Sequence, residues 1–205
     1  MSAPTHARAR RATAAALLTT LAPALTACGG GDESDEPAAR QTAANGDVYN
    51  AADVEFATEM IPHHADALVM VDMTQGRDLS PEMVELTEAV RAAQAPEIET
   101  MVDWLTAWGE EVPETSRDHA NSHDMDGMEG GMGMDPDDLA ALEDAEGSAF
   151  ESMWLDMMVE HHEGAIDMAR VEQADGAFPD AVALAESIEE SQTAEIEHMK
   201  EMAAG

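Results

Sequence analysis

Apolar residues and one histidine recur at helical spacing from residue 47 onward. In the first such segment they return at steps of three and four, which places them on one face of a helix. This face consists of Phe56, Met60, His63, Ala67 and Met70. The pattern predicts a helix that begins near Asp47 and is closed by Gly76.

A second helix is predicted from Ser80 to about Trp108. Ser80 is a suitable N-cap, and Pro81 is favoured at the first helical position because the N–H that it lacks would have no partner there. Pro62 and Pro96 fall inside the two helices. Each removes one backbone hydrogen bond, so we expect kinks rather than breaks. The face of the second helix consists of Val84, Leu86 or Thr87, Val90, Gln94, Ile98, Met101 and Leu105.

Residues 109–135 show no such face and are predicted to form a linker. Asp135 and Pro136 then supply another N-cap and first-turn proline, which predict a short helix over 136–145. A long helix is expected from about Ser148 to Gln173, and a last one from near Pro179. No segment alternates apolar and polar residues with period two, so we predict an all-α domain over 47–203.

The two predicted hairpins, 47–108 and 148–203, are copies of one another. Many residues are identical at one constant offset, 161 − 63 = 98, which indicates internal duplication of a helix hairpin. Two hairpins with one apolar face per helix bury those faces most simply as a four-helix bundle. Among the identical pairs are Met60 and Met158, His63 and His161, His64 and His162, Met70 and Met168, Gln94 and Gln192, Glu97 and Glu195, and Met101 and Met199.

Residues 1–27 are typical of a lipoprotein signal peptide. An arginine-bearing start precedes an apolar run that is too short to span a membrane as a mature helix. The run ends in a lipobox-like Leu-Thr-Ala-Cys, so we expect lipidation of Cys28 and export to the outer face of the cell membrane or the periplasm. The alternative is a plain secretory signal with an incidental thiol. Residues 28–46 are predicted to be a flexible tether.

The chain is strongly acidic, with 44 acidic and 9 basic residues and a formal net charge of −35. Such a surface repels nucleic acid and anionic lipid and attracts cations, so no nucleic-acid partner is expected. An acidic, lysine-poor surface is also typical of exported proteins of salt-loving or high-GC organisms, so charge alone does not indicate metal binding. Cys28 is the only cysteine, which excludes an intrachain disulfide and a thiolate metal site.

Each hairpin carries a Met-x-x-His-His unit. Met60 lies one turn from both His63 and His64 on a helix, so three donor atoms can converge; the second copy consists of Met158, His161 and His162, with Met157 as a further donor. Thioether and imidazole favour Cu(I) and silver over hard cations. The alternative is that the histidines are core residues hydrogen-bonded to carboxylates and the methionines fill the core.

The linker contains a second concentration of soft donors. Methionine has no packing reason to crowd a polar, glycine-rich segment, and mixed Met/His tracts of this kind resemble those of exported copper- and silver-handling proteins. Incidental low complexity is the alternative. The donors are His119, His123, Met125, Met128, Met132 and Met134.

The last helix contains Glu195-Ile-Glu-His198, a Glu-x-x-His half-motif of carboxylate-bridged di-iron bundles. The first half has Thr100 in place of His198, so a di-iron oxidase is only a third hypothesis. We find no nucleophile–base pair, phosphate loop or dinucleotide fingerprint, and we do not expect an enzyme.

Read together, four segments resemble the bacterial domain-of-unknown-function family 305 over about residues 47–203. The resemblance implies a ferritin-like four-helix bundle found in exported proteins, some of which bind copper and support copper or silver tolerance. It implicates two sets of residues, which need not be equivalent because His198 and Glu160 depart from the symmetric pattern: Met60, His63, His64 and Met101, and Met158, His161, His162 and Met199. The segments are FATEMIPHHADALVM, AAQAPEIETMVDWL, DDLAALEDAEGSAFESMWLDMMVEHHEGAIDMA and SQTAEIEHMKEM.

The leading hypothesis is an exported lipoprotein that binds copper, with Cu(I) favoured and silver as a second ion, as a metal buffer or chaperone. Its expected partners are metal ions, and it meets a membrane only through its lipid. The second hypothesis is a structural or adaptor lipoprotein. The candidate metal ligands are those two sets together with His198 and the linker residues His119, His123, Met125 and Met128.

Overall fold

A computed structural model describes residues 39–115 and 134–204, which lie in one compact unit, Pro37–Gly205. The predictions for Cys28, the signal peptide and the linker donors before Met134 lie outside these residues. The described part is helical apart from two very short strands, so the all-α prediction is confirmed. The elements are β1 (Gln41–Thr42), β2 (Val48–Tyr49), α1 (Ala51–Asp72), α2 (Pro81–Trp108), α4 (Pro136–Asp144), α5 (Ser148–Asp175) and α6 (Pro179–Ala204).

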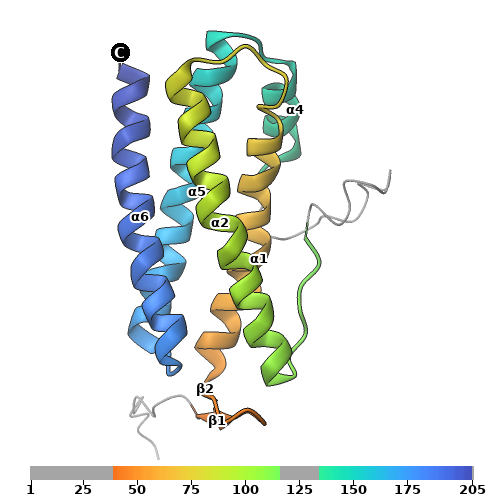
Figure 1. Cartoon of the computed structure of the whole chain (residues 1–205), viewed down its shortest axis with the longest axis vertical. Coiled ribbons are helices and arrows are strands. Elements are labelled where there is room, and N and C mark those ends of the chain that lie inside the picture. Colours follow the sequence, from red (N-terminus) through yellow and green to blue (C-terminus); the bar gives the residue numbers. More distant parts are fainter. Residues whose placement is uncertain (1–38, 116–133, 205) are drawn as a thin grey trace, which may run out of the picture. The chain divides into compact units, whose positions relative to one another are not determined.

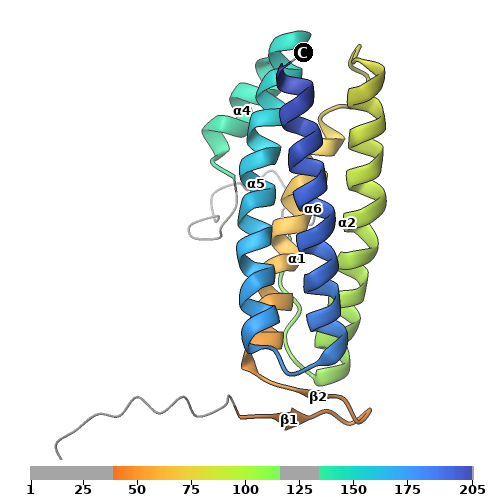
Figure 2. The ribbon, with the colours of Figure 1, turned by 90° about the vertical axis from the view of Figure 1, so that its left-hand side faces the viewer.

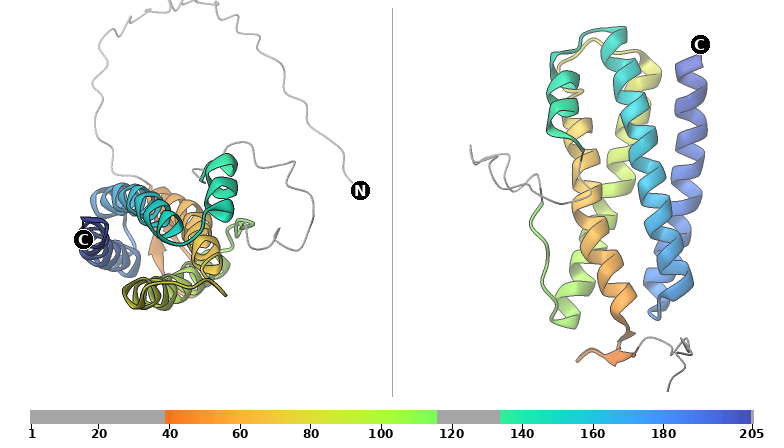
Figure 3. Two further views of the ribbon diagram at one scale, coloured as in Figure 1. Left: turned by 90° about the horizontal axis from the view of Figure 1, so that it is seen from above. Right: turned by 180° about the vertical axis from the view of Figure 1, so that it is seen from behind.

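Two antiparallel hairpins make the bundle (Figures 1 and 2). α1 packs against α2, α5 packs against α6, and α1 and α5 join the hairpins, with α4 lying against α5. Seen from above, the long helices follow the order α2, α1, α5, α6 (Figure 3). This order makes α1 and α5 the pair through which the two halves meet. No helix of the described residues has the length and apolar content needed to cross a membrane.

The first helix differs from the prediction at both ends. Residues 48–49 pair antiparallel with residues 41–42, so α1 begins at Ala51 rather than near Asp47. Asn50 caps the helix in a capping box with Asp53, whose carboxylate accepts the Asn50 N–H at 2.6 Å. The helix ends at Asp72, and Gly76, with φ of 76°, lies in the following turn. Strands of two residues are too short to show alternation, which explains why the sequence did not reveal them.

The other helices follow the sequence signals closely. The Ser80 hydroxyl accepts the Met83 N–H at 3.3 Å, and α2 ends at Gly109 in the left-handed region. Pro62 and Pro96 lie inside continuous helices, so neither breaks its helix. α4 ends one residue before the expected 145, and α5 extends two residues beyond Gln173.

The core consists of two hydrophobic clusters, which lie one after the other along the axis of the bundle. The first includes Phe56, Met60, Met101, Leu105 and Ile188. The second includes Met70, Val90, Phe150, Trp154, Met158 and Met199. Along every long helix, the residues that separate the two clusters include buried polar side chains. These form one polar layer across the middle of the bundle: His63, His64, Gln94, His161, His162 and Gln192.

Candidate metal centre

The second histidine of each pair is held by a glutamate of the adjacent helix. His64 Nε2 lies 2.8 Å from Glu97 Oε2, and His162 Nε2 lies 2.6 Å from Glu195 Oε2. Both imidazoles are fully buried, whereas the carboxylates are partly exposed. A carboxylate accepts hydrogen bonds, so the hydrogen of each imidazole is assigned to Nε2. These two contacts are the ones that the alternative to metal binding predicts, in which the histidines are core residues hydrogen-bonded to carboxylates.

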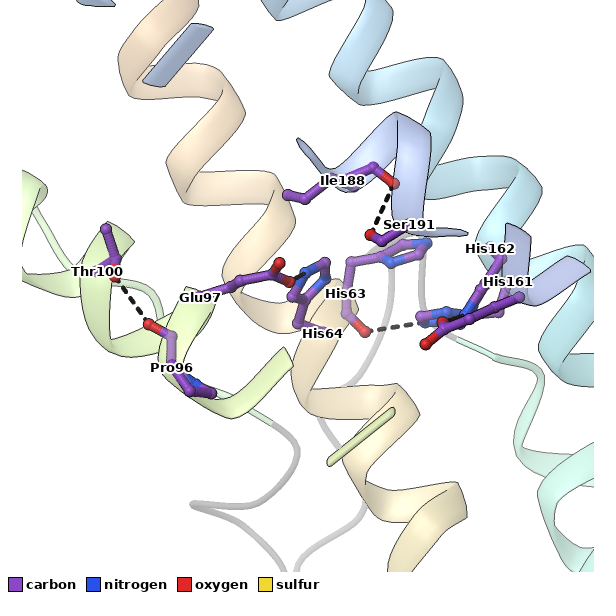
Figure 4. A network of polar contacts seen from close by, with 10 residues as sticks. His63, His64, Pro96, Glu97, Thr100, His161, His162, Ile188 and Ser191 are labelled. Carbon is purple, nitrogen blue, oxygen red and sulfur yellow. Dashed lines mark hydrogen bonds and ion pairs between the residues drawn. The ribbon is translucent and has the colours of Figure 1, made fainter. Parts of the chain in front are cut away.

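The first histidines of the pairs meet each other across α1 and α5 (Figure 4). The centroids of the His63 and His161 rings are 3.7 Å apart, with the planes tilted by 33°. His161 Nε2 donates to the His63 carbonyl oxygen at 2.9 Å. Burial, and secondly repulsion by the neighbouring histidines, lowers the pKa of His63 to about 3 and the pKa of His161 well below its usual range. Both rings are therefore neutral near pH 7, and two neutral rings can stack.

Each of the four histidines has a buried Nδ1 without a hydrogen-bond partner. In His64, His161 and His162 the hydrogen is assigned to Nε2, so in the neutral ring Nδ1 is a bare lone pair. Buried polar atoms of proteins are usually partnered, and each exception requires an explanation. An imidazole lone pair held at a fixed position can serve as a metal ligand. The polar layer therefore contains unused nitrogen donors.

The predicted methionine ligands lie directly beside this layer. Met60 and Met101 are fully buried in the first cluster, and Met158 and Met199 are fully buried in the second. The thioethers of the two halves thus lie on opposite sides of the histidines. His198 is exposed on α6, apart from the buried layer.

A cleft of about 370 Å³ opens beside the His63–His161 pair. The sequence analysis placed Met134 in the linker tract and Met157 beside His161, but it did not assign Met168 or the carboxylates to a site. Met168 was visible in the duplication, although its place in the lining of this cleft depends on the tertiary fold. The cleft is lined by His63, Met134, Asp135, Asp138, Met157, Glu160, His161, Gly164 and Met168.

Within residues 39–115 and 134–204, no group of three or more His, Cys, Asp or Glu side chains is arranged to hold a metal ion. The described residues therefore do not form the carboxylate and histidine cage that a di-iron site needs. The soft donors that the described residues do offer, imidazole and thioether, favour ions such as Cu(I) and Ag(I).

The sequence matches the model of DUF305, a domain of unknown function, over residues 53–203. The chain belongs to the DUF305 family. A DUF305 fragment from Deinococcus radiodurans is 24% identical with a TM-score of 0.63, and the match covers 80% of this chain and 99% of that one. A Streptomyces coelicolor DUF305 protein thought to be secreted is 27% identical with a TM-score of 0.63, covering 75% of this chain and 92% of that one.

The chain is also similar to CopM in its Cu(II)-bound form. The two are 32% identical with a TM-score of 0.60, and the match covers 74% of this chain and 95% of CopM. CopM has also been solved in Cu(I)-bound and Ag-bound forms. The sequence has no significant match among curated proteins. The DUF305 prediction is thus confirmed, and a similar protein binds the ions that the donor set of this chain favours.

Proposed function

We propose that this DUF305 protein is an exported lipoprotein that binds copper, and also silver, as a buffer or chaperone rather than as an enzyme. The observation that carries the proposal is the set of four buried histidines whose Nδ1 atoms have no partner. The fully buried thioethers of Met60 and Met158 lie on either side of them. The similarity to CopM, which binds copper and silver, supports the choice of ion.

The protonation state of these donors suits metal binding outside the cytoplasm. The lowered pKa values of His63 and His161 mean that protons do not compete for these nitrogens near neutral pH. Thioethers carry no proton at any physiological pH. The acidic surface would raise the local cation concentration, and lipidated Cys28 would keep the protein at the cell envelope.

The proposal is tested by titrating the mature chain with Cu(I) against a competing chelator. Replacing His63, His64, His161 and His162 with alanine is expected to lower the Cu(I) affinity by more than about tenfold, equivalent to about 1.4 kcal/mol. His198→Ala is the matched control, since His198 is exposed. Unchanged affinity in the fourfold variant would remove the bundle from the proposal and leave only the linker donors His119, His123, Met125 and Met128.

The His64–Glu97 and His162–Glu195 contacts favour a second candidate, a structural or adaptor lipoprotein with histidines as packing partners. Ligand that binds the native state raises the melting temperature. The structural role predicts that Cu(I) leaves the melting temperature of the wild type unchanged, whereas the metal-binding role predicts a rise.

A further inference from the structure

We propose that the space beside Gly164 is a binding site for one Cu(I) or Ag(I) ion, with His63 Nε2 and the Met168 thioether as its two protein ligands. This inference rests on the proposed function and makes it more specific. For His63 it assigns Nε2, rather than Nδ1, as the ligand atom, and it adds a methionine outside the Met-x-x-His-His units. It also assigns one such site to the chain rather than two.

Gly164 leaves open space on α5 directly in front of His63. A Cβ atom at position 164 would lie 3.2 Å from His63 Nε2. Apart from its two chain neighbours, no other side chain of the described residues comes within 4 Å of that position. Gly164 and His63 both line the cleft of about 370 Å³. An ion can therefore reach Nε2 from the cleft, at the place where any other residue would carry its Cβ.

The His63 ring has a nitrogen to offer at this place. His63 is only 6% exposed, and its ring makes no hydrogen bond within the part of the chain that the structure describes. Its nearest ring neighbour, His161, stacks on it with centroids 3.7 Å apart and so fixes its orientation. Nδ1 lacks a partner in either neutral form of the ring. An ion at Nε2 therefore selects the form with the hydrogen on Nδ1.

Met168 lies within reach of the same ion. It follows Gly164 by one turn of α5 and lines the same cleft. The Cβ atoms of residues four apart on a helix are about 5–6 Å from one another. A methionine side chain on a helix is directed toward the helix N-terminus, over the preceding turn, which here contains Gly164. The sulfur lies two bonds beyond its Cβ, so it can approach an ion held by His63 Nε2.

Two donors of this kind suit a soft monovalent ion. Imidazole and thioether are soft ligands, and Cu(I) and Ag(I) accept two donors in line. Hard cations instead need six or more ligands, mostly oxygen atoms. Asp138 and Glu160 are exposed at the cleft, where their charges attract cations. They do not combine with the histidines into a cage for a hard cation, as judged over residues 39–115 and 134–204.

The duplication does not reproduce this site in the first half. At the offset of 98, the counterparts of Gly164 and Met168 are Asp66 and Met70. Asp66 has the Cβ that Gly164 lacks, and Met70 is fully buried. The corresponding histidine nitrogen, His161 Nε2, already donates to a backbone carbonyl oxygen at 2.9 Å. The site is therefore present once per chain.

The test follows Ag(I) binding by the mature chain, with ¹³C-labelled methionine methyl groups and ¹⁵N-labelled imidazoles. Met168→Leu removes the sulfur and keeps the apolar volume. Met157→Leu is the matched control, since Met157 is partly exposed and lines the same cleft from the same helix. It precedes Gly164 by seven residues, about 10 Å along the helix axis, which is too far to share the ion. Ag(I) is added stepwise, and the NMR signals are assigned through single variants.

We expect the first equivalent of Ag(I) to shift the Met168 methyl signal and the His63 Nε2 signal, and to leave the Met157 methyl signal in place. Met168→Leu should weaken this first equivalent by at least about tenfold, whereas Met157→Leu should not. Equal binding by wild type and Met168→Leu, or a first shift in other methionines, would overturn the site while leaving the proposed function standing. No binding of Ag(I) or Cu(I) by the wild type would overturn both. If Met168→Leu does not fold, the wild-type shifts alone decide the outcome.

Discussion

Adjacent histidines in the same unit have different surroundings. Neighbouring residues of a helix point about 100° apart, so His63 faces the ring of His161 on α5 while His64 meets Glu97 on α2. The second half repeats this division with His161 and His162. Each unit therefore supplies one histidine to the contact between hairpins and one to the contact within its own hairpin.

The first prediction concerns the glutamate that holds His64. Glu97→Ala leaves a buried N–H without its acceptor and is expected to cost about 1–3 kcal/mol in the free energy of unfolding. Glu97→Gln should cost less, because the amide oxygen can still accept. Urea unfolding gives the measurement, with Glu99→Ala as the control because Glu99 is exposed on the same helix. Equal stability of Glu97→Ala and Glu99→Ala would show that the contact contributes nothing to stability.

Glu172 is a buried carboxyl group whose pKa is shifted upward, whereas the pKa values of the buried His63 and His161 are shifted downward. Burial, and secondly the nearby Asp53 carboxyl, raises the pKa of Glu172 to about 9. Asp53 itself accepts N–H groups from Asn50, Ala177 and Phe178, which tie the start of α1 to the turn before α6. Glu172 is thus protonated in the native state at neutral pH.

This proton gives a second prediction, about pH. Between the ordinary pKa of 4.5 and the raised value of about 9, the unfolded chain releases the Glu172 proton and the native chain keeps it. The contribution of Glu172 to stability is therefore fully present below about pH 4.5 and is lost as the pH rises to about 9. Glu172→Gln should remove this loss, so its advantage over wild type should grow across the window. Urea unfolding at several pH values tests this; a constant difference between the two proteins would contradict it.

At the scale of elements, α5 differs from its counterpart α1 through Gly164. Alanine in a helix interior is normally more stable than glycine by about 0.5–1 kcal/mol. At position 164 the added Cβ would crowd His63 Nε2 at 3.2 Å. We expect Gly164→Ala to give no gain in melting temperature and to weaken Cu(I) binding. The reverse exchange at the exposed Ala183 measures the ordinary glycine cost; a full gain in stability with unchanged affinity would show that the glycine is not needed.

Local signals predicted the elements well, and long-range contacts only in part. Ser80 and Asp135 marked helix starts because capping is a local interaction, and the duplication revealed two related hairpins. The strands were missed because residues 48–49 pair with residues 41–42 over too short a length to leave a pattern. The cleft was missed because Met134, which precedes α4, and residues of α5 line it together only through the way α4 packs against α5. Sequence spacing does not encode that packing.

At the scale of the whole molecule, charge repulsion opposes compactness. The chain has 44 acidic residues against 9 basic ones. Its exposed ion pairs, such as Arg170–Glu189 and Lys200–Glu163, are each worth at most about 1 kcal/mol. Salt weakens both attraction and repulsion, but repulsive pairs greatly outnumber attractive ones. Added salt should therefore stabilise the native state.

The corresponding measurement is the melting temperature between about 0.1 M and 1 M NaCl, over which the Debye length falls from about 10 Å to about 3 Å. We expect a rise of several degrees, and the same rise in KCl, because screening depends on ionic strength and not on the identity of the cation. Near pH 4 many carboxyl groups are protonated, so the rise should shrink. A rise that persists undiminished at pH 4 would assign the effect of salt to hydrophobic burial, and a fall at neutral pH would mean that the ion pairs outweigh the repulsion.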